Sequence, residues 1–458
     1  MTEIITLLAL LAVQVFVLYH RIRTRQKKSQ RENTLNIVLF CVSILLMAAG
    51  IYRPDFRWAG LFLLLVLQAA LSIRSILWPR PGKNAFRLKS ILLSFAGSTL
   101  LIVLLMMPAL LFPRNSPVMP TGPLATTTIS VTLTDPARVD PFSTSGEQRK
   151  LTVQFWYPDT GEIGEYPLIL FSHGAFGYRG SNRSTCMDLA SHGYVVASID
   201  HSHHAFFAQH TDSTTTPVDT TFLMDAIRVT GGEYDAQTVY DLTHQWLSVR
   251  TGDINFVLDE ILKSSGTVIP ESLSRRIQPD KIGLMGHSLG GAAAAQLGRD
   301  RSDIDGVTVL DGTMLGEEIS FVNSRAQLNP QPYPVPLLNL YNEDHYRDAI
   351  RRGTAYSNLS ASALAETSFD LVIPGSGHLN FTDLPLFSPV LASLLGTGSV
   401  DSRDCIVTMN RIVLEFFDRS LKGLPVPQSA LLSQEQSSDT RFRSEKHGVL
   451  AVRPAYVQ

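Results

Sequence analysis

Cysteine and charge are both scarce in this chain. Three cysteines in 458 residues exclude the disulfide-rich scaffold of a small secreted domain. They allow at most one disulfide in the second part of the chain, between Cys186 and Cys405. Charged residues make up 17% of the sequence, whereas about 25% is usual in soluble domains. The formal net charge of −2 gives no support for a nucleic-acid partner.

The first 112 residues are largely apolar, with long apolar runs in close succession. The runs cover residues 4–19, 35–52, 58–78 and 90–112. A membrane-spanning helix needs about 20 mostly apolar residues, with about 17 as the lower limit, so the last three runs qualify and the first is slightly short. Glu3 precedes the first run and basic residues follow it, which is the reverse of the charge order in a signal peptide. We therefore expect about four transmembrane helices in residues 1–112.

Lysine and arginine are unevenly distributed between these runs. The first connection carries six of them, the second two, and the third five when Arg74 near the end of the third run is included. Connections rich in lysine and arginine stay on the cytoplasmic side, so the first and third connections are expected to face the cytoplasm. The amino terminus and everything after Phe112 then face outward. This predicts a multi-pass protein of the cell membrane whose larger part lies outside the cytoplasm.

The rest of the chain has the composition of a globular domain. Residues 113–125 are proline-rich and are expected to form a linker, residues 126–424 the domain itself, and residues 425–458 a loosely ordered tail. Strand and helix patterns alternate in the domain, which predicts a mostly parallel sheet covered by helices on both faces. The strand patterns lie at 151–157, 167–171, 194–200, 306–310, 336–341 and 369–373, and the helical patterns at 183–192, 246–262 and 405–421. The polar, threonine-rich segment 205–240 is expected to be irregular, and to be either an insertion that shapes one wall of the pocket or a plain surface loop.

A Gly-X-Ser-X-Gly sequence at residues 286–290 is the strongest chemical signal in the chain. An apolar strand pattern precedes it and an alanine-rich helical pattern follows it. This is the context of a nucleophile elbow, in which a serine hydroxyl is held on a tight strand-to-helix turn. The fold class predicted is therefore an α/β-hydrolase fold, preceded by about four transmembrane helices, with Ser288 as nucleophile.

A serine nucleophile needs a histidine base and an acid that orients it, and in this fold both follow the serine along the chain. His345, His378 and His447 are the available histidines, and His378 is favoured because it lies in the loop after the strand pattern 369–373. For the acid, Asp311, Glu343 and Asp344 all follow strand patterns. Spacing alone leaves the choice between Asp311 and the later pair open.

The oxyanion of an acyl-transfer reaction needs two N–H donors directed at the developing charge. One is expected from the backbone of Leu289, the residue after the nucleophile. The other is expected from Ala175, in the loop after the strand 167–171, where Gly174 leaves room for the backbone to turn.

Four segments together resemble one known family. FSHGAFGYRGSNRSTCMDLASHGYVVASIDH, KIGLMGHSLGG, VLDGTM and GSGHLNFTD are similar, in order and approximate spacing, to the plasma-type (isoform II) platelet-activating factor acetylhydrolases, and the similarity covers about residues 151–421. The resemblance implies Asp311 as the acid, so that Ser288, Asp311 and His378 form the triad, with Leu289 and Ala175 as oxyanion hole. It also implies calcium-independent hydrolysis of short or oxidised acyl esters of phospholipids. The four apolar runs and the segment 205–240 have no counterpart in that pattern.

The function predicted is thus a membrane-anchored serine esterase or lipase acting on a phospholipid or another lipid ester, without a cofactor. A membrane acyltransferase that uses the same triad and a polyester or cutinase-like hydrolase are the alternatives. His201, His203 and His204 form a histidine cluster, but their spacing is not helical and no carboxylate or cysteine ligand is evident nearby in the sequence. We therefore expect no metal site there.

Overall fold

The computed structural model describes residues 2–25, 30–53, 55–78, 87–161, 164–263, 269–425 and 450–451. His447 and almost all of the expected tail lie outside these residues. The chain divides into two compact units, one comprising residues 1–115 with 387–391, and the other residues 116–386 with 392–458.

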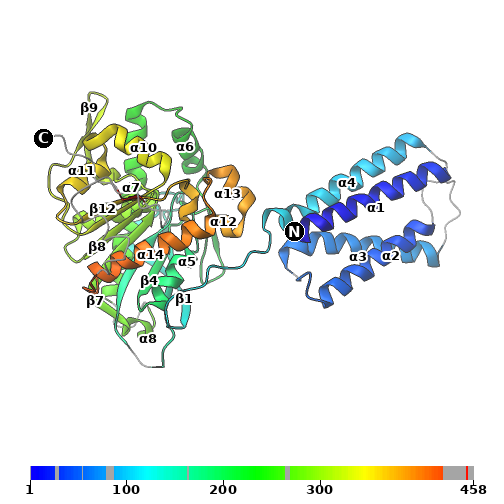
Figure 1. Cartoon of the computed structure of the whole chain (residues 1–458), viewed down its shortest axis with the longest axis horizontal. Coiled ribbons are helices and arrows are strands. Elements are labelled where there is room, and N and C mark those ends of the chain that lie inside the picture. Colours follow the sequence, from blue (N-terminus) through cyan, green and yellow to red (C-terminus); the bar gives the residue numbers. More distant parts are fainter. Residues whose placement is uncertain are drawn as a thin grey trace. The chain divides into compact units, whose positions relative to one another are not determined.

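The first unit is a group of four long helices (Figure 1). They are α1 (Thr2–Thr24), α2 (Gln30–Ala48), α3 (Phe56–Leu77) and α4 (Leu88–Leu111). Each is long and apolar enough to cross a membrane, judged by length and composition. The first helix has 23 residues and exceeds the apolar run 4–19 because its polar flanks are helical as well. α1 packs on α4, α4 on α3 and α3 on α2, around a small core that includes Leu10, Trp58 and Met106.

The second unit is built on a sheet that has nine strands in the described residues, in the order β1-β2-β4-β3-β7-β8-β11-β12-β13. Neighbours are parallel from β4 to β12, while β1, β2 and β13 are joined antiparallel. The strands are β1 (Thr126–Val139), β2 (Gln148–Pro158), β3 (Tyr166–Ser172), β4 (Val195–Asp200), β7 (Ile277–His287), β8 (Gly306–Leu310), β11 (Leu337–Tyr341), β12 (Ser368–Val372) and β13 (Leu450–Ala451). β4, β8 and β11 are buried along their whole length, as expected for parallel strands covered on both faces.

Helices cover both faces of this sheet and divide its core into two layers. α7 and α9 share one apolar cluster with the sheet, and α5 and α14 share the other. The helices are α5 (Arg183–Ser191), α6 (Thr220–Thr230), α7 (Ala236–Lys263), α8 (Glu271–Ser274), α9 (Leu289–Asp300), α10 (Glu343–Arg352), α11 (Ser357–Leu364), α12 (Leu384–Phe387), α13 (Pro389–Leu395) and α14 (Ser402–Ser420), with short 3-10 turns η1 (Leu315–Glu317), η2 (Gly353–Ala355) and η3 (His378–Phe381). Two hairpins complete the unit, β5 (Phe207–Gln209) with β6 (Thr215–Pro217) and β9 (Glu318–Val322) with β10 (Arg325–Leu328). The mostly parallel sheet with helices on both faces confirms the predicted fold class.

The segment 205–240 differs from the prediction, because it is not irregular. It contains the β5–β6 hairpin, α6 and the start of α7, which begins ten residues before the predicted helix 246–262. Asp219 caps α6 by accepting a hydrogen bond from the Phe222 N–H at 2.8 Å, and Phe222 and Ala226 turn an apolar face inward. The threonine-rich composition hid this helix, since its stability comes from packing rather than from helix propensity.

The two cysteines of the second unit are not joined. Cys186 on α5 and Cys405 on α14 are both free and buried, within the same apolar cluster. Burial raises the pKa of the Cys405 thiol to about 12, so this side chain behaves as an apolar core residue.

Candidate active site

Ser288 lies on the tight turn between β7 and α9. Its φ of 53° falls in the left-handed region, which costs a non-glycine residue on the order of 1–2 kcal/mol. The two flanking glycines are required by packing. A Cβ on Gly286 would lie 2.1 Å from the Gly290 carbonyl oxygen, and one on Gly290 would lie 2.0 Å from the Ser172 carbonyl oxygen. The local sequence therefore folds as a nucleophile elbow, with the serine at the start of a helix.

Asp311 follows β8, the strand next to β7, and its carboxylate is buried and surrounded by donors. His378 Nδ1 donates to Oδ2 at 2.6 Å and His345 Nδ1 to Oδ1 at 2.8 Å. Asn342 donates its backbone N–H to Oδ1 at 2.8 Å and its side-chain N–H to Oδ2 at 2.5 Å. Burial alone would raise the pKa of this carboxyl, but the hydrogen bonds from His345 and His378 outweigh burial and lower it. Asp311 is therefore ionised at neutral pH.

His378 begins the 3-10 turn η3, after β12. Its side chain is 42% exposed, so the ring nitrogen that does not face Asp311 is open to a substrate. His287, the residue before Ser288, donates from Nε2 to the His378 carbonyl oxygen at 3.1 Å, and the two rings lie 4.6 Å apart between centroids. Ser288 in turn donates its backbone N–H to the Leu310 carbonyl, next to Asp311, at 2.9 Å. Ser288, Asp311 and His378 are thus gathered at the carboxyl ends of three strands.

The later acid candidates lie elsewhere. The Asp344 side chain, on the first turn of α10, is 90% exposed and pairs with Arg347. Glu343 pairs with the same arginine and accepts a hydrogen bond from the Gly375 N–H at 2.6 Å. Of the three acids that spacing left open, the structure brings Asp311 to His378.

His345 is a contact of the acid that sequence reasoning considered only as an alternative base. Since its Nδ1–H donates to Asp311, its Nε2 is left to accept from the Tyr356 hydroxyl. Tyr356 is bonded in turn to the Thr313 hydroxyl at 2.9 Å. Thr313, Tyr356, His345 and Asp311 therefore form a hydrogen-bonded chain that ends at the carboxylate. The only signal for it in the sequence is the position of His345 just after β11.

The loop after β3 carries the expected second oxyanion donor. Arg250, fully buried on α7, donates to the His173 carbonyl at 2.7 Å and to the Gly174 carbonyl at 3.3 Å. Because a trans peptide points its C=O and N–H in opposite directions, fixing the Gly174 carbonyl toward Arg250 turns the Ala175 N–H away from that side. Among the described residues, neither the Ala175 N–H nor the Leu289 N–H donates to a protein acceptor. A Cβ on Gly174 would lie 3.2 Å from the Ser288 Cβ, so this loop rests against the elbow.

A buried network of charged and histidine side chains contacts the loop after β3 on its inner side. Asp253 accepts from Arg149 at 2.7 Å and from His201 Nδ1 at 2.9 Å, and Arg250 donates to His204 Nδ1 at 3.1 Å. Burial lowers the pKa of His201 to about 3, which keeps it neutral. Burial lowers the pKa of Arg250 to about 9, so the guanidinium remains charged at neutral pH. The histidine cluster seen in the sequence therefore contains residues of this network.

An apolar wall stands beside the two candidate donors. Phe222 of α6 and Trp246 of α7 form a buried cluster against which Ala175, Phe176 and Leu289 pack. The segment 205–240 supplies part of this wall, in agreement with the interpretation of it as an insertion that shapes the pocket, although α6 itself was not predicted. An acyl chain bound at Ser288 would find apolar surface here.

Known proteins resemble this chain over the second unit. Residues 156–430 match the family described as platelet-activating factor acetylhydrolase, isoform II. The platelet-activating factor acetylhydrolase of Bos taurus is 28% identical over 280 residues, which is 57% of this chain and 58% of that protein. A probable 1-alkyl-2-acetylglycerophosphocholine esterase of Arthroderma benhamiae is 26% identical over 244 residues, 53% of this chain and 55% of that protein. The chain therefore matches less than two thirds of the length of these relatives.

A solved structure shares the fold. The ferulic acid esterase of Streptomyces cinnamoneus superposes with a TM-score of 0.55 and 22% identity, covering 73% of this chain and 98% of the esterase. At that identity the likeness shows the fold alone. The family match, in contrast, spans more than half of the sequence and includes the elbow, Asp311 and His378. The chain belongs to the platelet-activating factor acetylhydrolase family of isoform II type.

Proposed function

We propose that this protein is a membrane-anchored serine esterase that hydrolyses a phospholipid or another lipid ester. The observation that carries the proposal is the 2.6 Å hydrogen bond from His378 Nδ1 to Asp311, next to a serine held on a nucleophile elbow. A buried, ionised carboxylate that accepts a hydrogen bond from Nδ1–H leaves Nε2 of the same ring free to act as a base.

In the proposed reaction, Ser288 Oγ attacks the ester carbonyl carbon while His378 Nε2 takes the hydroxyl proton. The N–H groups of Leu289 and Ala175 stabilise the oxyanion of the tetrahedral intermediate. The intermediate collapses when the alcohol leaves with the proton from His378, and the acyl group stays on Ser288. Water then attacks the acyl-enzyme with His378 again as base, which releases the carboxylic acid and restores the serine.

The substrate class rests on the relatives and on the first unit. The bovine relative is named as an acetylhydrolase of platelet-activating factor and the fungal one as a probable esterase of a 1-alkyl-2-acetylglycerophosphocholine, so short-acyl phospholipids are the leading substrates. Four helices of membrane-spanning length support anchoring in a bilayer, where such esters are concentrated. The distribution of lysine and arginine between the helices supports a catalytic unit outside the cytoplasm.

The activity is tested with the full chain reconstituted in lipid nanodiscs. Turnover of short-acyl phosphatidylcholines and of a chain-length series of nitrophenyl esters is expected, and Ser288→Ala should abolish it. Ser145→Ala, in an exposed loop of the same unit, is the matched control and should retain full activity. Turnover that survives Ser288→Ala contradicts the proposed nucleophile. Acyl-enzyme that breaks down only when a sugar or lipid alcohol is added would instead indicate an acyltransferase.

Thiol labelling tests on which side of the membrane the catalytic unit lies. Cys186 and Cys405 are buried and Cys41 is exposed on α2, so S145C in a C41S background carries one accessible thiol among the described residues. A membrane-impermeant maleimide is expected to label S145C in intact cells. Labelling only after permeabilisation would place the catalytic unit in the cytoplasm.

A further inference from the structure

The four helices of the first unit share a small apolar core, but α1 and α2 do not pack closely on each other. α1 packs on α4 and α2 packs on α3, while three cavities are each lined by residues of both α1 and α2. We call this opening the α1–α2 seam. Its cavities have volumes of about 270, 260 and 300 Å³ and differ in chemistry along the helices.

The part of the seam nearest the start of α1 is apolar. Leu10 and Val13 of α1, Leu39 and Leu46 of α2 and Leu65 of α3 line the 270 Å³ cavity. Ala9 also lines it and is exposed. A cavity of this kind accepts a hydrocarbon chain, because its walls offer dispersion contacts without requiring hydrogen bonds.

The middle part of the seam is polar although it lies within apolar helices. Gln14, Asn36 and Gln68 line the 260 Å³ cavity. Gln14 accepts from Ser98 at 2.8 Å and Asn36 donates to Ser72 at 3.1 Å, whereas the Gln68 side chain has no hydrogen-bond partner among the described residues. Gln68 is only partly buried within the protein, but an unpaired amide surrounded by hydrocarbon still costs on the order of 2–7 kcal/mol. We therefore expect an occupant of this cavity to carry hydrogen-bonding groups at the level of Gln68.

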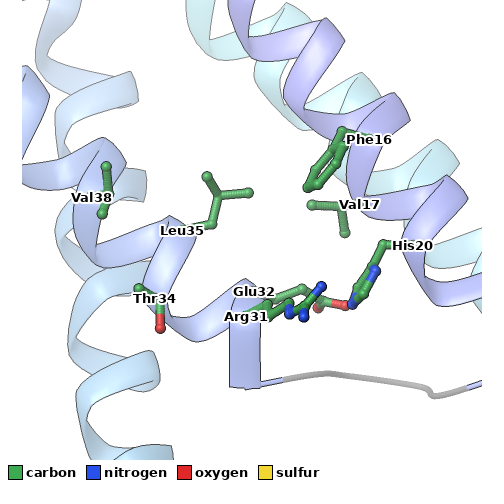
Figure 2. Close-up of a pocket in the computed structure, with 8 residues that line it drawn as sticks. All are labelled: Phe16, Val17, His20, Arg31, Glu32, Thr34, Leu35 and Val38. Carbon is green, nitrogen blue, oxygen red and sulfur yellow. The ribbon is translucent and has the colours of Figure 1, made fainter. Parts of the chain in front are cut away.

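The far end of the seam carries basic groups. Figure 2 shows His20 of α1 and Arg31 of α2 at one end of the 300 Å³ cavity, with Phe16 and Leu35 beyond them. Arg21 is neutralised by Glu32, which accepts from it at 2.9 and 2.8 Å. Arg31 has no carboxylate partner in the described residues, so its positive charge at this end of the cavity is uncompensated.

We propose that the α1–α2 seam binds one glycerophospholipid of the inner leaflet. Its phosphodiester lies at His20 and Arg31, its ester carbonyls at the level of Gln68 and Asn36, and one acyl chain in the apolar cavity. The order of charged, hydrogen-bonding and apolar surfaces along the seam matches the order of groups in such a lipid. His20 and Gln14 are six residues apart, about 9 Å along a helix axis, which is the scale of a lipid headgroup and glycerol region. The inference rests on the proposed insertion in a membrane and is independent of the esterase site.

The experiment measures lipid binding to the full chain by native mass spectrometry from detergent. The probes are phosphatidylglycerol, phosphatidylcholine and diacylglycerol, the last of which lacks the phosphodiester. Wild-type chain is expected to retain one molecule of either phospholipid and to bind diacylglycerol at least tenfold more weakly. The double variant His20→Ala/Arg31→Ala should raise the phospholipid dissociation constant at least tenfold. Ala9→Trp, which fills the apolar cavity, should do the same with the polar end intact.

Arg351→Ala, on the exposed end of α10, is the control and should bind lipid as the wild type does. Equal binding of diacylglycerol, or equal phospholipid affinity of all variants, would overturn the proposal. A stable pair of chains whose seam is closed by a second copy, with no lipid retained, would overturn it as well. If carbonate washing releases the protein from membranes, the insertion itself is contradicted. If the protein stays inserted but retains no lipid, only the proposed lipid site in the seam is contradicted.

Discussion

Oδ1 of Asp311 accepts a hydrogen bond from Nδ1 of His345 at 2.8 Å. The other carboxylate oxygen faces His378, so one carboxylate is held between two imidazoles. His345 is itself held through its contact with Tyr356. This arrangement fixes the plane of the carboxylate and keeps its charge, and both properties are needed to orient the His378 ring.

His345 is therefore expected to act as a positioning residue for the acid. Loss of a hydrogen bond to a charged group costs about 1.5–3 kcal/mol, so His345→Ala should lower kcat about 10- to 100-fold with little change in KM. Tyr356→Phe, which keeps the bond from His345 to Asp311, should have a smaller effect. His210→Ala removes another buried histidine, bonded to two threonines, and should leave kcat unchanged. An unchanged kcat in His345→Ala would show that His378 and Asn342 suffice to hold the acid.

A single substitution at each position distinguishes Asp311 from Asp344 as the catalytic acid. Asp311→Asn should lower kcat by about 10⁴-fold, since the histidine loses its orienting charge. Asp344→Asn should stay within about twofold of wild type, because an exposed carboxylate paired with one arginine contributes little. Steady-state kinetics on one nitrophenyl ester checks both, and the opposite ranking would move the acid to the strand end of β11.

Arg250 is expected to position the Ala175 N–H through the carbonyls of His173 and Gly174. Arg250→Met should lower kcat about 100-fold, similar to the loss of one oxyanion donor, while KM changes little. Arg250→Lys keeps a charge and should recover part of this loss. Arg299→Met breaks another largely buried ion pair, with Glu317, and controls for stability. If Arg299→Met and Arg250→Met reduce kcat equally, Arg250 has only a structural role.

The buried histidines make stability depend on pH. Burial, followed by the charge of His378, lowers the pKa of His287 to about 3, whereas an unfolded histidine titrates near pH 6.5. Between these values the unfolded chain binds a proton that the folded chain does not, so stability is full above about pH 6.5 and falls as the pH falls, by about 1.4 kcal/mol per pH unit. His287→Gln should therefore lose about 2 kcal/mol less than wild type between pH 7 and pH 5. Urea unfolding at the two pH values measures this, and equal losses would contradict the neutral, buried state of His287.

Features carried by consecutive residues were predictable from the sequence. The elbow at 286–290 places two glycines and the serine within five neighbouring positions, and Gly286 is confined by Gly290 itself, although Gly290 is confined by Ser172 of β3. The helices of the first unit follow from long apolar runs. The alternation of strand and helix patterns predicted the mostly parallel sheet, which the structure confirms. The helix α6 was missed because only contacts with distant residues reveal its apolar face.

The sequence by itself thus determined the fold class, the nucleophile candidate and a short set of possible partners for it. Asp311 follows β8, whereas Glu343 and Asp344 follow β11, the strand next to β12, so neighbouring strand ends do not predict the partner of His378. The tertiary structure decided that Asp311, and neither Glu343 nor Asp344, meets His378, because the loop after β12 brings the His378 ring to the carboxylate beyond β11. It also brought His345 to the acid and Arg250 to the loop before Ala175. His345 lies 34 positions from Asp311, and Arg250 lies 77 and 76 positions from His173 and Gly174. No local pattern records a contact that only the packing of separate elements creates.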